Sequence, residues 1–135
     1  MLVSRARDLY ARYLLDLQQI SQNGNKGYER MRGYLSPTAF RAEARSFDAL
    51  SRKGVNTIGP SKLIKFVVQR VDADRGTVTA YACIDMSQVR VVSDEGKDIT
   101  PSARPNKQTF LPSFTMTNGV LRLEKNGIWA GDSVC

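Results

Sequence analysis

Histidine is absent from this chain of 135 residues, and several kinds of active site depend on it. Without histidine there is no Ser-His-Asp triad, no Cys-His pair, no HExxH zinc site and no imidazole general base. Two cysteines are too few for a four-thiolate zinc site. Neither the G-x-x-x-x-G-K-[ST] nor the G-x-G-x-x-G phosphate-binding loop is present. We therefore expect no metal, no cofactor and no catalytic residue: the protein is predicted not to be an enzyme.

Long hydrophobic runs are also missing. No stretch approaches the roughly 18 consecutive apolar residues that a membrane span needs. Residues 1–3 are too short for a signal peptide and Arg5 interrupts them, so any signal or membrane anchor is expected to lie outside this sequence. The apolar fraction of 41% and the charged fraction of 24% are typical of a globular protein. The length fits one domain over residues 1–135.

Acidic residues are scarce in the first half of the chain. Residues 1–70 carry 13 basic and 5 acidic side chains, whereas residues 71–135 carry 7 and 8. Clustered basic charge can bind nucleic acid by releasing counterions from phosphates. The basic residues here alternate with acidic ones, and no nucleic-acid-binding motif accompanies them. The pattern favours a solvated helix surface beside an acidic partner or an anionic surface, with no specific nucleic-acid partner.

The hydrophobic pattern predicts helices first and strands afterwards. Apolar residues three and four apart predict a helix over residues 2–20 and a short helix or ordered turn within 28–35. Ser36 and Pro37 are typical of a helix start, and Gly54 of the following helix end. Beyond Gly54 the period becomes two. The expected strands cover residues 62–71, 77–85, 88–92, 97–99, 108–117 and 120–124, with a last strand opening at Ile128.

Three further details shape the predicted sheet. Asn118-Gly119 favours a two-residue hairpin. Pro112 predicts a bulge or an edge position, because proline cannot donate to a strand ladder. One sheet face must be covered, and the helices are the only candidates. The expected fold class is α+β, with the helices (about 2–53) packed on a curved antiparallel sheet (about 55–135).

The two cysteines leave two interpretations open. Cys83 lies within a predicted strand and Cys135 ends the sequence. They can be independent small apolar residues. They can also form a bond that closes a loop of about fifty residues, worth roughly 4 kcal/mol in the chain-entropy model. The spacing alone does not decide between these.

A family resemblance does bear on them. The Cys-x-Asp-x-Ser pattern of Cys83, Asp85 and Ser87, the later Gly-x-Trp ending at Trp129 and the terminal Cys135 resemble small exported actinobacterial proteins of lipoprotein or membrane-anchored type. These have the NTF2-like (SnoaL-like) cone fold. The resemblance implies a Cys83–Cys135 disulfide, an extracytoplasmic location and a strand ended by local backbone bonds of Asp85 and Ser87. Trp129 would be a core or rim aromatic of the last strand.

The same resemblance implies a function. It suggests a non-catalytic extracytoplasmic domain that mediates interaction or assembly at the cell envelope, through a protein partner or as a homodimer. Any membrane contact would need a segment absent from this chain. The alternative is a small-molecule-binding protein or SnoaL-like enzyme that uses the cone pocket, with Asp85 as the acid to examine; a desolvated acid in that pocket would favour this alternative. The aromatic residues expected to line the pocket are Tyr10, Tyr13, Phe40, Phe47, Phe66, Phe110 and Phe114.

Overall fold

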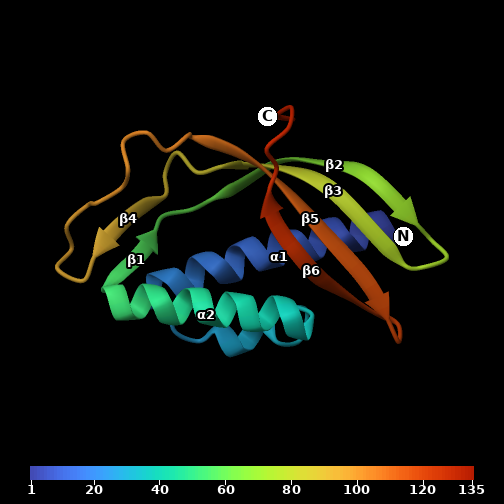
Figure 1. Ribbon diagram of the computed structural model, residues 1–135, viewed down its shortest axis with the longest axis horizontal. Helices are drawn as coiled ribbons and strands as arrows, with labels where there is room; N and C mark the ends of the chain where they lie inside the picture. The colour runs from blue at the N-terminus through green and yellow to red at the C-terminus, as the bar shows by residue number, and fades with distance from the viewer.

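The computed structural model describes residues 1–135, with the helices preceding the strands along the chain (Figure 1). Helix α1 is Leu2–Gln22, the short 3-10 helix η1 is Tyr28–Met31 and helix α2 is Pro37–Lys53. The strands are β1 (Val55–Ile58), β2 (Lys62–Asp72), β3 (Thr77–Asp85), β4 (Arg90–Ser93), β5 (Lys107–Thr117) and β6 (Val120–Ile128). The predicted α+β class is confirmed, since the helices pack on a curved antiparallel sheet. None of the helices has the length and apolarity needed to cross a membrane.

The ends of α2 follow from its capping residues. The Ser36 side chain accepts a hydrogen bond from the Ala39 N–H at 3.1 Å, and Pro37 occupies the first helical position. Gly54 ends the helix in the left-handed conformation, with φ of 68°. Both ends of α2 lie where the sequence predicted them.

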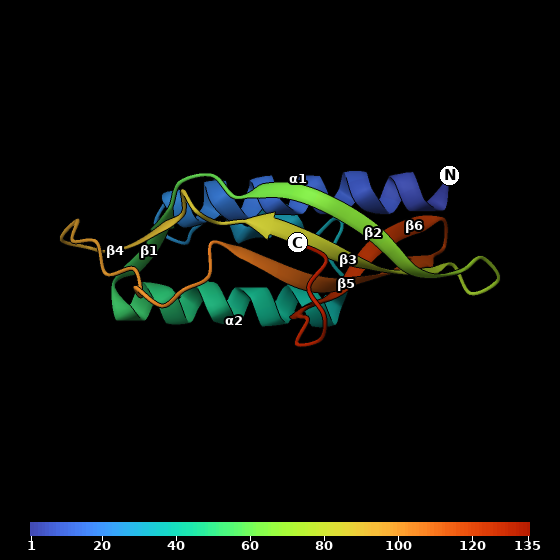
Figure 2. The ribbon, with the colours of Figure 1, turned by 90° about the horizontal axis from the view of Figure 1, so that it is seen from above.

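Four strands form the main sheet, in the order β2-β3-β5-β6. The small residues Val78, Ala80 and Ala82 of β3 are fully buried, and β3 contacts α1. The three share one face of the sheet because side chains alternate along a strand. Figure 1 shows both helices below strands β2 and β3, and the view from above in Figure 2 shows the strands of the main sheet passing over the space between α1 and α2. The inner face of the sheet therefore meets α1 closely, while α2 stands off from β3 and β5 and touches β6 and β1.

The strand predicted at residues 88–92 is present as β4, but it lies outside the main sheet. It was expected in one sheet with the other strands, whereas β4 pairs with β1 in a separate two-stranded sheet, Val55 opposite Ser93. Gly59 makes this crossing possible: a Cβ there would lie 2.1 Å from the Gln88 carbonyl oxygen, and its φ is +92°. The 97–99 segment pairs with β4 through an antiparallel bridge between Val92 and Asp98 and two backbone hydrogen bonds, Ser93 N–H to the Lys97 carbonyl and Ile99 N–H to the Val91 carbonyl.

The end of the sheet also differs from the prediction. A turn was expected at residues 125–127, but β6 continues through them, with Asn126 opposite Pro112. The Lys-Asn-Gly sequence favours a turn locally, yet pairing with the long strand β5 overrides that preference. The register of β5 and β6 shifts between Ser113 and Phe114, next to Pro112. This shift leaves Glu124 as an extra, bulged residue on β6. Pro112 lies in an interior strand, and the β3–β5 pairing is interrupted there.

Candidate functional site

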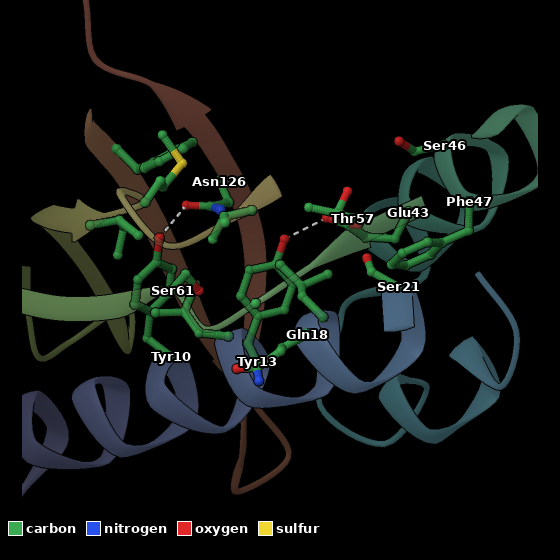
Figure 3. Close-up of a pocket in the computed structure, with 17 residues that line it drawn as sticks. Tyr10, Tyr13, Gln18, Ser21, Glu43, Ser46, Phe47, Thr57, Ser61 and Asn126 are labelled. Carbon is green, nitrogen blue, oxygen red and sulfur yellow. Dashed lines mark hydrogen bonds between the residues drawn. The ribbon is translucent and has the colours of Figure 1, made fainter. Parts of the chain in front are cut away.

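A pocket of about 370 Å³ lies between α1, α2, β1 and the inner face of the sheet (Figure 3). Its volume falls in the range of small-molecule sites, roughly 300–1,000 Å³. Of the predicted aromatic residues, Tyr10, Tyr13, Phe47 and Phe110 line it. The other lining residues are Leu14, Leu17, Gln18, Ser21, Glu43, Ser46, Thr57, Gly59, Ser61, Ile84, Met86, Val89 and Asn126. Most of the wall is apolar.

The other three predicted aromatics lie outside the pocket. Phe66 and Phe114 pack on the ring of Tyr10, with centroids 6.0 Å and 6.3 Å from it. Phe40 packs edge-on against Tyr28 in the core, outside the lining of this pocket. These three rings pack in the protein interior. Four of the seven aromatic residues expected in the pocket therefore line it.

Sequence reasoning missed the acid of this pocket, Glu43. Glu43 lies on α2, three residues after Phe40 and four before Phe47. This spacing places it on the same inner face as the apolar stripe of the helix. The Tyr13 hydroxyl donates a hydrogen bond to Glu43 Oε1. Burial raises the pKa of Glu43, and the Tyr13 hydrogen bond partly offsets that rise. No lysine or arginine lines the pocket, so the carboxylate has no cationic partner there.

Asn126 completes the polar side of the pocket. The Tyr10 hydroxyl donates to Asn126 Oδ1 at 2.9 Å. Burial is the main cause of the raised pKa of both Tyr10 and Tyr13, which keeps the two phenols neutral. Glu43 Oε2 and Asn126 Nδ2 have no hydrogen-bond partner within the chain, and neither is sealed in the interior. The pocket therefore presents one free acceptor and one free donor group.

A second hollow, of about 400 Å³, lies on the other side of this group, between α2 and β6. It shares Tyr13, Glu43 and Asn126 with the first. These three residues form the boundary between the two hollows. The hydrogen-bonded Tyr13–Glu43 pair is thus reachable from two sides.

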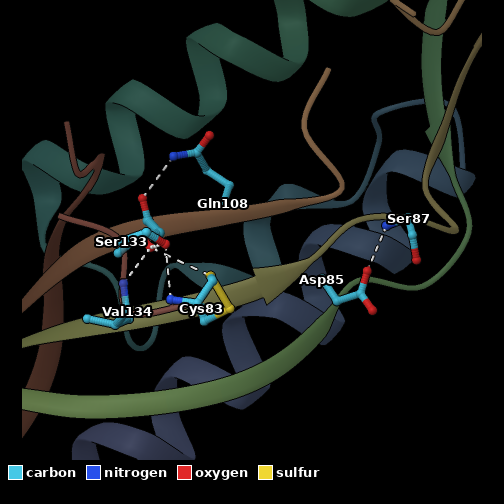
Figure 4. The surroundings of a disulfide bond; sticks show 8 residues. Cys83, Asp85, Ser87, Gln108, Ser133 and Val134 are labelled. Carbon is cyan, nitrogen blue, oxygen red and sulfur yellow. Dashed lines mark hydrogen bonds between the residues drawn. A yellow bond between two sulfur atoms is a disulfide. The ribbon is translucent and has the colours of Figure 1, made fainter. Parts of the chain in front are cut away.

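Asp85, the acid singled out from the sequence, does not line either hollow. It is placed at the end of β3, where its Oδ1 accepts from the Ser87 N–H at 2.9 Å (Figure 4). That backbone hydrogen bond is the main cause of its lowered pKa, with smaller contributions from Lys107 and Lys62. The contact is of the local kind that the resemblance implied for Asp85 and Ser87.

The structure contains the expected disulfide between Cys83 and Cys135, with Cα atoms 5.2 Å apart (Figure 4). Cys83 projects from the outer face of β3, away from the helices, and residues 129–135 cross that face. The Thr109 hydroxyl lies 3.1 Å from the Ser133 hydroxyl and accepts from the Val134 N–H at 3.3 Å. Trp129 packs edge-on against Tyr81, with ring centroids 5.2 Å apart.

Comparison with known proteins identifies the fold and goes no further. No family model matches the chain, and no curated protein matches it. The intermembrane-space region of the chloroplast protein ARC6 superposes with a TM-score of 0.67 at 13% identity, over 97% of this chain and 98% of that one. Aln2 from a Streptomyces species superposes with a TM-score of 0.53 at 19% identity, over 91% of this chain and 85% of that one. The fold is the NTF2-like (SnoaL-like) cone that the resemblance implied.

Proposed function

We propose that this protein is a non-catalytic, extracytoplasmic NTF2-like domain that binds a partner protein at the cell envelope. The observation that carries the proposal is strand β2. It is an edge strand of 11 residues, so one row of its backbone N–H and C=O groups has no strand partner. Four aliphatic side chains on it, Ile64, Val67, Val68 and Val71, are 36–46% exposed. Exposed apolar edges of this kind mark interaction sites.

The charges of β2 indicate the chemistry of the partner. Lys62, Lys65 and Arg70 are exposed along the same strand, and no acidic side chain pairs with them. Register shifts beside Ile64 and Gln69 leave residues 65–68 as the regular stretch between two bulges. The fitting partner is an extended segment with apolar and acidic side chains, docked along this edge.

Two observations support the proposed location. A disulfide persists in oxidising compartments and is rare in the cytosol. The ARC6 region with the same fold is an intermembrane-space region of a chloroplast protein. The exported actinobacterial type that the sequence resembles fits both observations and remains part of the proposal.

The protonation states and hydrogen bonds of the titratable side chains in and near the pocket support the proposed non-catalytic role. Both phenols have a raised pKa, which makes them poor bases at neutral pH. Asp85 lies outside the pocket and binds local backbone. Glu43 is the one acid there; its burial favours the pocket-based alternative, but its Oε1 already accepts the Tyr13 hydroxyl and both phenols beside it stay protonated. The groups fit a binding surface better than a proton-transfer relay.

Site-specific photocrosslinking in the producing cells tests the β2 proposal. A crosslinking residue at Val67 or Val71 should give one discrete adduct with an envelope protein, and the same residue at Arg45 on α2 should not. The paired change Val67→Asp with Val71→Asp should abolish that complex, because two carboxylates would be desolvated at the interface. Both side chains are exposed, so the fold should be retained.

The chain offers a matched control on the opposite edge of the sheet. The exposed fraction of Val120 on β6, 40%, is similar to those of Val67 and Val71. Because Val120 lies on the other edge, Val120→Asp should leave the complex intact. Equal adducts from β2 and α2, or a complex insensitive to the β2 substitutions, would contradict the proposal. An adduct between two copies of this chain, matched by a dimer in sedimentation, would replace the heterologous partner with self-association.

A further inference from the structure

The pocket holds an ionisable acid without a counter-ion. Glu43 is the only Asp, Glu, Lys or Arg among the residues that line the first pocket. A carboxylate removed from water is costly unless a cation or several hydrogen bonds compensate it. Within the chain Glu43 has one such bond, from Tyr13, and its Oε2 remains unpartnered. The site is electrostatically incomplete.

We propose that this pocket binds a small amine whose ammonium group pairs with Glu43 Oε2 and whose apolar body lies against Phe47 and Phe110. This assignment goes beyond the envelope interaction proposed for β2 and uses a different part of the molecule. The two proposals can therefore fail separately.

The lining of the pocket selects this ligand class over others. An ammonium supplies the positive charge and the hydrogen-bond donor that Glu43 lacks, and such a charged hydrogen bond is stronger than a neutral one. A carboxylate or phosphate ligand would meet Glu43 with like charge and find no lysine or arginine. A metal ion would need several ligating groups, and no cluster of three or more acidic or cysteine side chains exists. The aromatic walls favour a ligand with an apolar body.

The net charge of +7 opposes a cation at long range. Salt screens such effects beyond about 8 Å at physiological ionic strength, so the nearest groups decide. Those near Glu43 are Tyr10 and Tyr13 on α1, both neutral, and Glu124 and Lys125 on β6 at the second hollow. Lys125 forms no ion pair with Glu43. The local field at Glu43 Oε2 is therefore that of an unneutralised carboxylate.

Three probes of one shape test the proposal by calorimetry on the full chain: phenylbutylamine, phenylbutanol and phenylbutyrate. The amine should bind about tenfold or more tightly than the alcohol, as expected for gaining a charged hydrogen bond. The carboxylate should bind more weakly than the alcohol. Equal affinities for amine and alcohol, or no amine binding at millimolar concentration, would overturn the proposal.

Substitution identifies the group responsible. Glu43→Gln keeps the shape and the Tyr13 contact but removes the charge, so the amine should lose its advantage over the alcohol. Glu95→Gln, in an exposed turn, is the matched control and should bind as the native chain does. An amine preference that survives Glu43→Gln would assign the binding to another site and refute the proposal.

The native chain gives a second readout that needs no variant. The amine requires ionised Glu43, so its affinity should rise as the pH rises through the raised pKa of that group, while the affinity of the alcohol should stay constant. Tyr10 and Tyr13 stay neutral in that range, because burial raises the pKa of both phenols. Parallel pH profiles for amine and alcohol would also overturn the proposal.

Discussion

Two tyrosine–carboxylate hydrogen bonds lie beside α1, and they have opposite surroundings. Near η1, the Tyr34 hydroxyl donates to Asp16 at 2.6 Å, Arg30 lies 3.8 Å from the same carboxylate, and the Arg12 guanidinium lies 4.6 Å above the Tyr34 ring. In the pocket, Tyr13 donates to Glu43, which forms no ion pair: no arginine or lysine lines the first hollow, and Lys125 at the second is not paired with it. The chemistry of the contact is the same, but only the first pair is neutralised.

The difference separates a pair that serves the fold from one that serves a site. The Tyr34–Asp16 bond ties the turn after η1 to α1 in a buried position, where Arg30 compensates the carboxylate. The Tyr13–Glu43 bond borders two hollows, and the partly buried Glu43 carboxylate has no cationic partner in the first of them, which disfavours its charged form. Proteins commonly keep such local departures from optimal stability at functional sites. We therefore take the uncompensated pair as the mark of function.

The largest expected effect on the free energy of unfolding comes from the disulfide on the outer face of the sheet, not from either tyrosine–carboxylate pair. Replacing both Cys83 and Cys135 with alanine should lower the free energy of unfolding by up to about 4 kcal/mol, since the bond closes a loop of 52 residues in sequence separation. Urea denaturation with and without reductant measures it. Residues 129–135 should lose hydrogen-exchange protection.

Both tyrosine pairs should survive that change, because the bond lies on the outer face and they lie on the inner one. Loss of the amine preference of the pocket in the alanine variant would contradict this independence. It would mean that the tail and the helices are coupled through the sheet.

Breaking the compensated pair should have the next largest effect. Asp16→Ala leaves the Tyr34 hydroxyl without its acceptor in a buried position and Arg30 without its partner. The expected loss is about 2–3 kcal/mol, the cost of an unsatisfied buried polar group. Thermal or urea denaturation measures this loss in unfolding free energy. A loss well under 1 kcal/mol would show that this pair is no more structural than the one in the pocket.

Much of the fold was predictable because its signals are local. The Ser36-Pro37 start and Gly54 end of α2, the β2–β3 hairpin and the Asn118-Gly119 turn each depend on a few adjacent residues. The errors came from long-range pairing. β4 pairs with β1 across more than thirty residues of chain, and β6 runs through a Lys-Asn-Gly sequence because β5 offers it a partner.

The candidate site was predictable only in part, for the same reason. The helix stripe places Tyr10, Tyr13 and Phe47 inward, and the pattern around Phe40 and Phe47 also places Glu43 there. What the sequence does not show is that α2 touches the main sheet at β6 but stands off from β3 and β5, so that part of this face meets a pocket rather than a packed core. Asn126 was missed because the predicted strand stopped at residue 124.

Breaking the pocket pair should cost less than breaking the buried one. Tyr13→Phe removes the donor to Glu43, but the carboxylate borders two hollows that admit water, so solvent can replace the lost bond. The expected change in unfolding free energy is below about 1 kcal/mol. A loss equal to that of Asp16→Ala would mean that the two pairs play the same structural role and would remove the basis of the comparison.

The smallest effect, and the sharpest test of the comparison, is the pH dependence of stability. In the folded chain the pKa of Glu43 is raised above its ordinary value of 4.5 by burial. Between these two pKa values the folded state holds more protons than the unfolded state, so the free energy of unfolding falls as the pH rises. Asp85 and Asp98 have lowered pKa values and contribute in the opposite sense, but only below their ordinary values.

The measurement is the urea midpoint of the native chain and of Glu43→Gln from about pH 4 to about pH 8, the range in which a raised carboxyl pKa acts on stability. Glu43→Gln cannot ionise, so its advantage over the native chain should grow as the pH rises through the Glu43 pKa and then level off. Glu95→Gln should run parallel to the native chain throughout. Parallel curves for Glu43→Gln as well would mean that Glu43 ionises at no cost. The pocket acid would then be as well compensated as Asp16, and the contrast between the two pairs would be lost.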